Sequence, residues 1–216
     1  MEKKKIVIAV DSFKGTMTAI EVCESISEGI KAVAPETEII ELPIADGGEG
    51  TLETLLYAMK GDKINIVVND PYMNKIESYY GIVEEGKTAI IEMALSSGLI
   101  LVGENKNPMK TTTYGMGEMI LDALDKGCRN FIVGIGGSAT NDGGIGMASA
   151  LGVNFTDEYG KEISLNGEGL SSLYKIDISK MDSRIEECRF TVACDVDNPL
   201  YGINGAAHIY GPQKGA

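Results

Sequence analysis

The sequence predicts an α/β protein, and two observations carry that prediction. The first 69 residues alternate between strand and helix patterns in the order β-α-β-α-β, which is the signature of a parallel α/β sheet. In addition, thirteen of the 27 glycines fall in three short segments, 46–50, 134–146 and 202–215, each beside an apolar run. Glycines clustered in this way mark loops where the backbone approaches another group closely or takes a positive φ.

The N-terminal elements follow from apolar periodicity and from helix-start signals. Residues 5–10 form a short continuous apolar run, typical of a strand buried on both faces. Thr18 and Glu21 have the spacing of a capping box, and the apolar helical stripe behind them stops at Pro35. The remaining predicted elements are a strand at 38–42, a helix at 49–59 and a strand at 64–68.

The pattern changes near residue 70. Residues 76–84 and 88–93 are adjacent strand-like runs separated by Glu85-Gly86-Lys87, which predicts an antiparallel hairpin. The α/β alternation then returns, with a helix at 114–126, a strand at 131–135, a helix ending near Leu151 and a last strand at 189–194. These changes predict two discontinuous domains: a parallel α/β domain at 1–69 plus 104–152, and a mixed one at 70–103 plus 153–216.

Composition excludes several classes of protein. Lys and Arg number 19 against 32 Asp and Glu, a net charge of −13, which argues against nucleic-acid binding. No apolar run reaches the roughly 18–20 residues of a membrane span, and the short run after the charged N-terminus is no signal peptide. The four cysteines are widely spaced. Cys23 and Cys128 have apolar helical neighbours, so we expect them to pack as small hydrophobic residues in a reducing compartment. We therefore expect a cytoplasmic protein.

The end of the chain predicts an incomplete protein. Residues 202–216 are rich in glycine and stop in Gly-Pro-Gln-Lys-Gly-Ala without a predicted closing helix or strand. Domains usually end after a packed element. We therefore expect the chain to be the first part of a longer protein.

The first candidate loop brings a carboxylate, a hydroxyl and an ammonium group together before a helix. Lys14 suits an anionic substrate group or a phosphate, with Ser12 beside it, and Asp11 could accept a proton or hold a metal-bound water. The alternative is a surface turn in which Asp11 is a local hydrogen-bond acceptor.

The second candidate loop has two consecutive glycines before a helix. The N–H groups of Gly47 and Gly48 could bind an anion together with the helix dipole. Asp46 and Glu49 would repel a bare phosphate, but Mg²⁺ shared between carboxylate and phosphate would reconcile them. The alternative is a tight turn capped by Asp46.

The third candidate loop, 134–146, has the layout of a phosphate cradle: strand, glycine-rich turn and helix N-terminus. Its candidate binding residues are Gly136, Gly137, Ser138, Thr140 and Asn141. It is neither a Walker A motif nor Gly-x-Gly-x-x-Gly, because no Gly-Lys-Ser/Thr follows and the glycine spacing differs. A purely structural tight turn is the alternative.

Two further candidate sites come late in the chain. Asp195 and Asp197 follow a predicted buried strand at i, i+2, so both could ligate one metal, or one could act as a base oriented by the other. An Asx-type turn is the alternative. Lys214 adds a cation in a Gly-Pro loop, and His208, the only histidine, is expected to be a packing residue. Anion-binding loops, two lysines and Mg²⁺-capable carboxylates fit phosphoryl transfer.

Taken together, these segments resemble the bacterial type I glycerate kinases. The matching stretches are 11–15, 43–51, 112–115, 134–151 and 193–216, in order along the whole chain. The resemblance implies ATP- and Mg²⁺-dependent phosphorylation of D-glycerate, with 2-phosphoglycerate favoured over 3-phosphoglycerate. It also implies two α/β domains, one with a Rossmann-like or flavodoxin-like parallel sheet, and an active site in the cleft between them. Members of this family are considerably longer than this chain.

The resemblance also suggests residue roles. Lys14 and Ser12 would contact the glycerate carboxylate or the transferred phosphate, and Asp195 or Asp197 would be the base or the Mg²⁺ ligand, with Asp46 a second candidate. The four residues that would serve the nucleotide phosphates or shape the cleft are Gly136, Gly137, Ser138 and Asn141. Two other functions remain open: a non-catalytic fragment of such a kinase, and a dinucleotide-dependent oxidoreductase that uses 134–144 as its cofactor loop.

Overall fold

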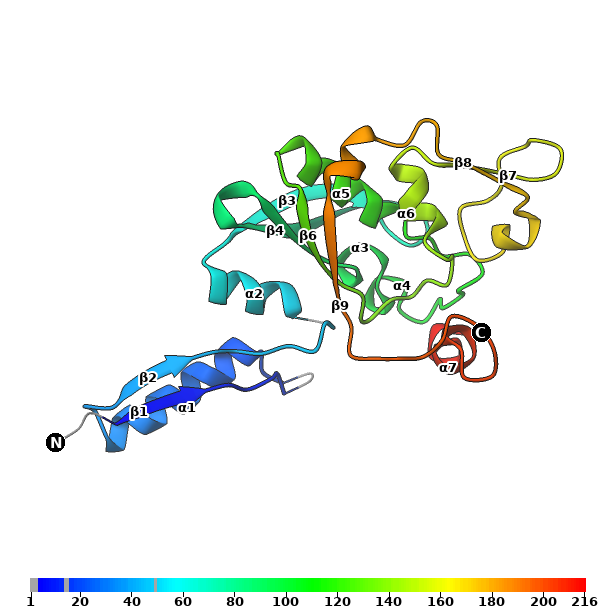
Figure 1. The fold of residues 1–216 in the computed structure, drawn as a ribbon. Helices are drawn as coiled ribbons and strands as arrows, with labels where there is room; N and C mark the ends of the chain where they lie inside the picture. Colours follow the sequence, from blue (N-terminus) through cyan, green and yellow to red (C-terminus); the bar gives the residue numbers. More distant parts are fainter. Residues whose placement is uncertain (1–3, 14–15, 49) are drawn as a thin grey trace.

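The computed structural model describes residues 4–13, 16–48 and 50–216 (Figure 1). Its N-terminal unit extends away from the rest of the chain and consists of strands β1 (Lys5–Ile8) and β2 (Glu38–Glu41) with helix α1 (Ala19–Val33). The two strands pair in parallel. The predicted capping box at the start of α1 is confirmed, because the Thr18 side chain accepts from the Glu21 N–H and the Glu21 carboxylate accepts from the Thr18 N–H. Cys23 lies on the buried face of this helix.

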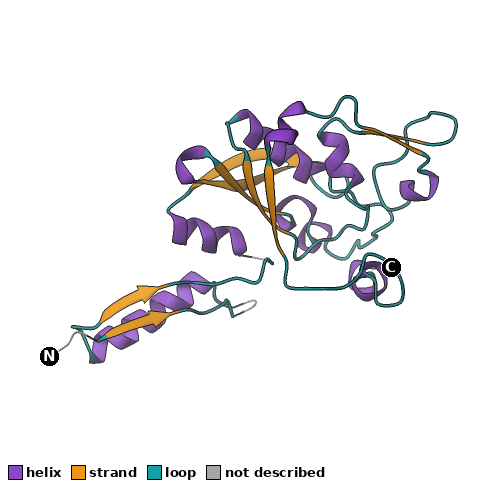
Figure 2. Cartoon of the chain, viewed as in Figure 1, coloured by secondary structure: helices purple, strands orange, loops and turns teal. Residues whose placement is uncertain are grey.

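The larger sheet, whose strands are orange in Figure 2, has five strands in the order β3-β4-β5-β6-β9. Its strands are β3 (Asp62–Asn69), β4 (Lys75–Val83), β5 (Thr88–Glu92), β6 (Asn130–Gly134) and β9 (Arg189–Ala193). The pairs β3–β4 and β4–β5 are antiparallel, whereas β5–β6 and β6–β9 are parallel. The predicted α/β class and the hairpin of β4 and β5 are therefore confirmed.

The expectation that the third strand continues the first parallel sheet is wrong. Helix α2 (Thr51–Met59) leads into β3, which pairs with β4 over eight residues instead of joining β1 and β2. The physical reason is local: the turn at 70–74 is short, so an antiparallel partner lies next to β3 in sequence. The larger sheet thus crosses the expected boundary near residue 70, and the division into two domains stays a prediction.

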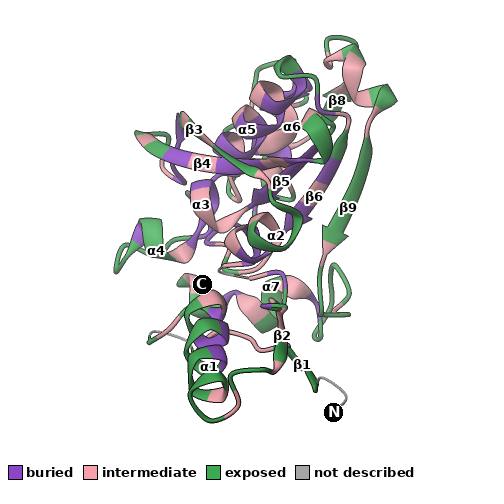
Figure 3. Cartoon of the chain, turned by 90° about the vertical axis from the view of Figure 1, so that its left-hand side faces the viewer, coloured by how far each residue is buried: buried purple, intermediate pink, exposed green. Residues whose placement is uncertain are grey.

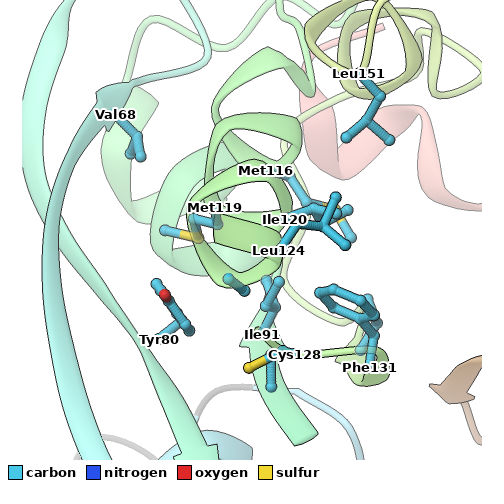
Figure 4. Packing of buried hydrophobic residues seen from close by; sticks show 13 residues of the cluster. Val68, Tyr80, Ile91, Met116, Met119, Ile120, Leu124, Cys128, Phe131 and Leu151 are labelled. Atoms are coloured by element: carbon cyan, nitrogen blue, oxygen red, sulfur yellow. The ribbon is translucent and has the colours of Figure 1, made fainter. Parts of the chain in front are cut away.

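The main core lies between this sheet and helix α5 (Tyr114–Asp125). Figure 4 shows Met119, Ile120 and Leu124 of α5 packed with Ile91 and Phe131 of the sheet, and all five side chains are buried. The helix predicted at 114–126 is thus confirmed. The sheet and α5 form the scaffold from which the functional loops extend.

The remaining elements are short. They are helices α3 (Ala94–Ser97), α4 (Leu99–Val102), α6 (Ile145–Ala150) and α7 (Ala206–Tyr210), strands β7 (Asn154–Thr156) and β8 (Lys175–Asp177), and 3₁₀ turns at Glu84–Gly86, Gly169–Ser172, Ser183–Glu187 and Pro212–Lys214. The expectation that the chain ends without a closing helix or strand is wrong, because α7 and the last 3₁₀ turn form there. Both are too short to show a helical period in the sequence. In Figure 3, strand β9 is largely exposed at the edge of the larger sheet.

Candidate active site

One large cavity of about 1690 Å³ collects the candidate loops from all parts of the chain. Ligand pockets usually measure about 300–1,000 Å³, so this cavity has room for more than one small molecule. The predicted site residues that line it are Asp11, Ser12, Asp46, Gly47, Gly48, Gly136, Gly137, Ser138, Thr140, Asn141, Asp195 and Lys214. Asp197 is exposed and is not part of the lining, and Lys14 lies outside the described residues.

The glycines of two loops are explained by close backbone contact. The N–H of Gly136 donates to the carbonyl O of Gly47 at 3.1 Å. A Cβ on Gly136 would lie 2.6 Å from the Cα of Gly48, and a Cβ on Gly47, whose φ is +90°, would lie 2.6 Å from the carbonyl O of Ala193. Only glycine permits this approach. These glycines therefore allow the loops that follow β2 and β6 to lie against each other and against the end of β9.

Two of the candidate carboxylates make the local contacts of tight turns. The Asp46 Oδ1 accepts from the N–H of Gly48 at 2.9 Å, and the Asp11 Oδ1 accepts from the N–H of Ser12 at 2.6 Å. These are the turn-capping contacts that the structural alternatives predicted for both loops. Both residues still line the cavity, so a local contact does not remove them from the site.

The phosphate cradle expected before α6 stays a prediction, and a carboxylate of the chain contacts the backbone at the start of this helix. Helix α6 begins at Ile145, and the carboxylate of Asp142 accepts from the N–H groups of Gly144 and Gly146 at 3.0 and 3.2 Å. The N–H of Gly136 is likewise bonded within the protein. A carboxylate of the chain itself thus satisfies two N–H groups at the start of α6. The predicted cradle residues themselves line the cavity.

A second buried carboxylate accepts hydrogen bonds at the start of α2. Glu92, at the end of β5, is 2% exposed and accepts from the N–H groups of Gly50 and Leu52 at 3.3 and 3.2 Å. It satisfies orphan N–H groups at the start of this helix. Sequence reasoning missed Glu92 and Asp142, although a carboxylate inside the apolar run 89–93 is an unusual feature that could have indicated the first of them.

Lys214 is the only Lys or Arg among the described residues that line the cavity. Its Nζ donates to the carbonyl O of Thr140 at 2.6 Å and to the Oγ of Ser138 at 3.4 Å. Burial lowers the pKa of Lys214, and the negative charge of Asp142 opposes that shift in part. The ammonium group thus lines the cavity and is also hydrogen-bonded to the glycine-rich loop.

Asp195 follows β9 and lines the cavity as an exposed side chain, so a substrate can reach its carboxylate. Among the described residues, no group of three or more His, Cys, Asp or Glu side chains is placed to hold a metal ion. Mg²⁺ commonly binds through one or two carboxylates together with substrate phosphates, for which such a group is not needed. His208 lies exposed on α7, so the expectation that it packs in the interior is wrong.

Comparisons with known proteins agree with the sequence resemblance. The sequence model of the glycerate kinase family matches residues 6–216. A glycerate kinase of Haemophilus influenzae is 51% identical over 213 residues, which are 98% of this chain and 56% of that protein. A glycerate 2-kinase of Escherichia coli is 50% identical with the same coverage.

A solved structure assigned as a glycerate kinase 2 of Salmonella typhimurium superposes with a TM-score of 0.92 at 46% sequence identity. The match covers 99% of this chain and 57% of that one. The chain therefore spans a little over half the length of these relatives. In the ranges that the structure describes, no helix is both long and apolar enough to cross a membrane.

Proposed function

The chain belongs to the glycerate kinase family, and on this premise we propose that it phosphorylates D-glycerate with ATP at the cavity described above. The observation that carries the proposal is the meeting of loops from five separated regions around one cavity that contains Lys214. The family assignment favours this function over a dinucleotide-dependent oxidoreductase. The name of the Escherichia coli relative, a glycerate 2-kinase, supports the 2-hydroxyl as acceptor.

The cavity lining fits the two substrates and a magnesium ion chemically. Ser12, Ser138 and Thr140 provide hydroxyl donors for phosphate or carboxylate oxygens, and Lys214 provides a positive charge. The carboxylates of Asp11 and Asp46 are the hard oxygen ligands that Mg²⁺ prefers. When bound with ATP, Mg²⁺ neutralises part of the phosphate charge and so permits the approach of an acceptor oxygen.

In the proposed reaction, Asp195 takes the proton of the glycerate 2-hydroxyl. A bond forms between that oxygen and the γ-phosphorus, the bond from the γ-phosphorus to the bridging oxygen breaks, and ADP leaves with the bond's electron pair. Lys214 holds an anionic group of the substrates in place. The carboxylate caps Asp142 and Glu92 keep the surrounding backbone rigid, so the donors are preorganised rather than recruited during the reaction.

Replacing Lys214 with Met is expected to raise the KM for D-glycerate by about tenfold or more, because hydrogen bonds to charged groups contribute about 1.5–3 kcal/mol. Lys214→Arg should retain much of the affinity because it retains the charge. Steady-state kinetics with D-glycerate as the varied substrate measures both effects. An unchanged KM and kcat in Lys214→Met would exclude this residue as the anion contact.

The same lysine predicts a dependence on pH. Because the pKa of Lys214 is lowered by burial, its ammonium loses the proton at a less alkaline pH than an exposed lysine does. Anion binding is thus complete below that pKa and is lost as the pH rises through it. Lys214→Arg should remove this alkaline rise in KM, because the guanidinium group stays protonated.

The identity of the product tests the position of phosphorylation. ³¹P NMR of the reaction mixture should show 2-phosphoglycerate as the initial product, formed only when ATP and D-glycerate are both present. Exclusive 3-phosphoglycerate would exclude the 2-hydroxyl as the acceptor and leave the kinase assignment standing.

A further inference from the structure

Asp142 is a buried carboxylate that connects two helices and a loop beside the cavity. It is 2% exposed and lies between the first residues of α5 and of α6. A buried carboxylate is costly unless its oxygen atoms are satisfied. The contacts of Asp142 therefore indicate what holds this part of the structure together.

All of the hydrogen-bond partners that the structure gives this carboxylate are donors. Its Oδ2 accepts from the N–H and the Oγ1–H of Thr113 at 2.9 and 2.8 Å and from the N–H of Gly146 at 3.2 Å, while its Oδ1 accepts from the N–H of Gly144 at 3.0 Å. The Thr113 Oγ1 in turn accepts from the N–H of Met147 at 2.9 Å. One charged group thus joins the start of α5 to the start of α6.

The backbone around this contact is so tightly packed that two of its glycines could not carry a side chain. A Cβ on Gly146 would lie 2.1 Å from the Thr112 Oγ1, and a Cβ on Gly117 would lie 2.5 Å from the carbonyl O of Met147. The two helices therefore lie in close contact next to Asp142. A displacement of the carboxylate would move both helix starts and the loop that precedes α6.

The same loop forms one wall of the cavity. Thr113, Thr140, Asp142 and Gly144 all line it, and the Lys214 Nζ donates to the carbonyl O of Thr140. Asp142 also interacts electrostatically with Lys214, because its charge favours the protonated ammonium. The position of the Lys214 ammonium group thus depends on the loop that Asp142 holds in place.

We propose that Asp142 is a positioning residue for phosphoryl transfer: it fastens segment 138–144 to the start of α5 and so holds Ser138, Thr140 and Lys214 in one geometry at the cavity. The inference rests on the proposed kinase function. Asp142 acts through the loop in this account, so its own carboxylate contacts neither substrate.

The test compares Asp142→Asn with a matched control, Asp157→Asn. An Asn side chain has one acceptor oxygen, so its NH₂ group must face an N–H that the carboxylate accepted from. Asp157 accepts from the N–H groups of Tyr159 and Lys161 in a turn that is not part of the cavity lining. The control therefore makes the same chemical change in a similar turn outside the site.

We expect kcat/KM to fall about 100-fold in Asp142→Asn, mainly through kcat, because a misplacement of about 1 Å can cost that much. Asp157→Asn should match the parent protein. The assay is run at a temperature where circular dichroism shows both variants fully folded, so lost stability cannot lower the rate. Unchanged kinetics in folded Asp142→Asn would overturn the proposal.

Thr113 provides a second test within the same contact. Thr113→Ser retains the hydroxyl that donates to Asp142, whereas Thr113→Val removes it at similar volume. We expect the Ser variant to retain the parent kcat and the Val variant to lose activity in the same direction as Asp142→Asn. Equal kinetics in the two variants would overturn the proposed role of this hydrogen bond.

Hydrogen exchange separates this inference from the proposed function. In Asp142→Asn, the amides of Gly144 and Gly146 should exchange at least tenfold faster than in the parent, while amides in the middle of α5 keep their rates. A parent protein that lacks kinase activity would overturn the proposed function. Unchanged exchange at both glycines would overturn the fastening role of Asp142 in an active or an inactive protein.

Discussion

Replacing Asp195 with Asn is expected to lower kcat for D-glycerate phosphorylation by about 10²–10⁴-fold, the range that a positioned general base supplies. Asn has nearly the same shape but cannot take the hydroxyl proton. Since Asp195 lines the cavity directly after β9, the loss should appear in kcat and leave the KM for ATP nearly unchanged. Initial rates of ADP release at varied ATP and D-glycerate measure both constants.

Two further variants make the Asp195 result specific. Asp197→Asn tests the other candidate carboxylate of this segment, which is exposed and not part of the cavity lining. Asp177→Asn changes a turn carboxylate, bonded to the N–H of Ser179, that is also outside the lining, and should match the parent. Full activity in Asp195→Asn together with a large loss in Asp197→Asn would assign the base to Asp197.

Gly136→Ala is expected to lower kcat/KM by about 100-fold, because it separates the two glycine loops. The added Cβ would lie 2.6 Å from the Cα of Gly48 and 3.1 Å from the carbonyl O of Gly47, and neither backbone can move without displacing the cavity wall. The hydrogen bond from the Gly136 N–H to Gly47 would lengthen as well. A displacement of about 1 Å at a catalytic site can cost 10²-fold in rate.

The control for this substitution is Gly29→Ala in helix α1. Apart from the neighbouring residues and the backbone of α1 itself, no described heavy atom lies within 4 Å of a Cβ at Gly29. Alanine in a helix interior is favoured over glycine by about 0.5–1 kcal/mol. Gly29→Ala should therefore raise the free energy of unfolding slightly and leave the kinetics unchanged. If Gly136→Ala kept the parent kcat/KM, the close contact of the loops would not matter for catalysis.

The elements that the sequence predicted well are those defined by local contacts. The capping box at Thr18 and Glu21 involves residues three apart, and the hairpin of β4 and β5 joins neighbours in the chain. By contrast, the sheet to which β3 belongs depends on whether β3 pairs with β4 or with the sheet of β1 and β2. Apolar alternation shows that a segment is a strand but contains no information about which strand lies beside it.

The candidate site shows the same limit. Glycine clusters at strand ends predicted which loops line the cavity, because the carboxyl ends of parallel strands are where such sheets bind ligands. The carboxylates that hold the loops were missed, because Asp142 meets Thr113 across 29 residues and Glu92 meets Leu52 across 40. The sequence does not show which helix start either carboxylate contacts, because the fold alone brings them together.

The most direct test of the central claim is an assay of ADP release from MgATP with D-glycerate as the acceptor. It is run on the chain alone and on the chain mixed with the part of the Escherichia coli relative that lies outside the matched 213 residues. We expect D-glycerate-dependent ADP release in at least one arm, reduced by Asp195→Asn and by Lys214→Met. Absence of D-glycerate-dependent ADP release in both arms would contradict a phosphoryl-transfer site in this cavity.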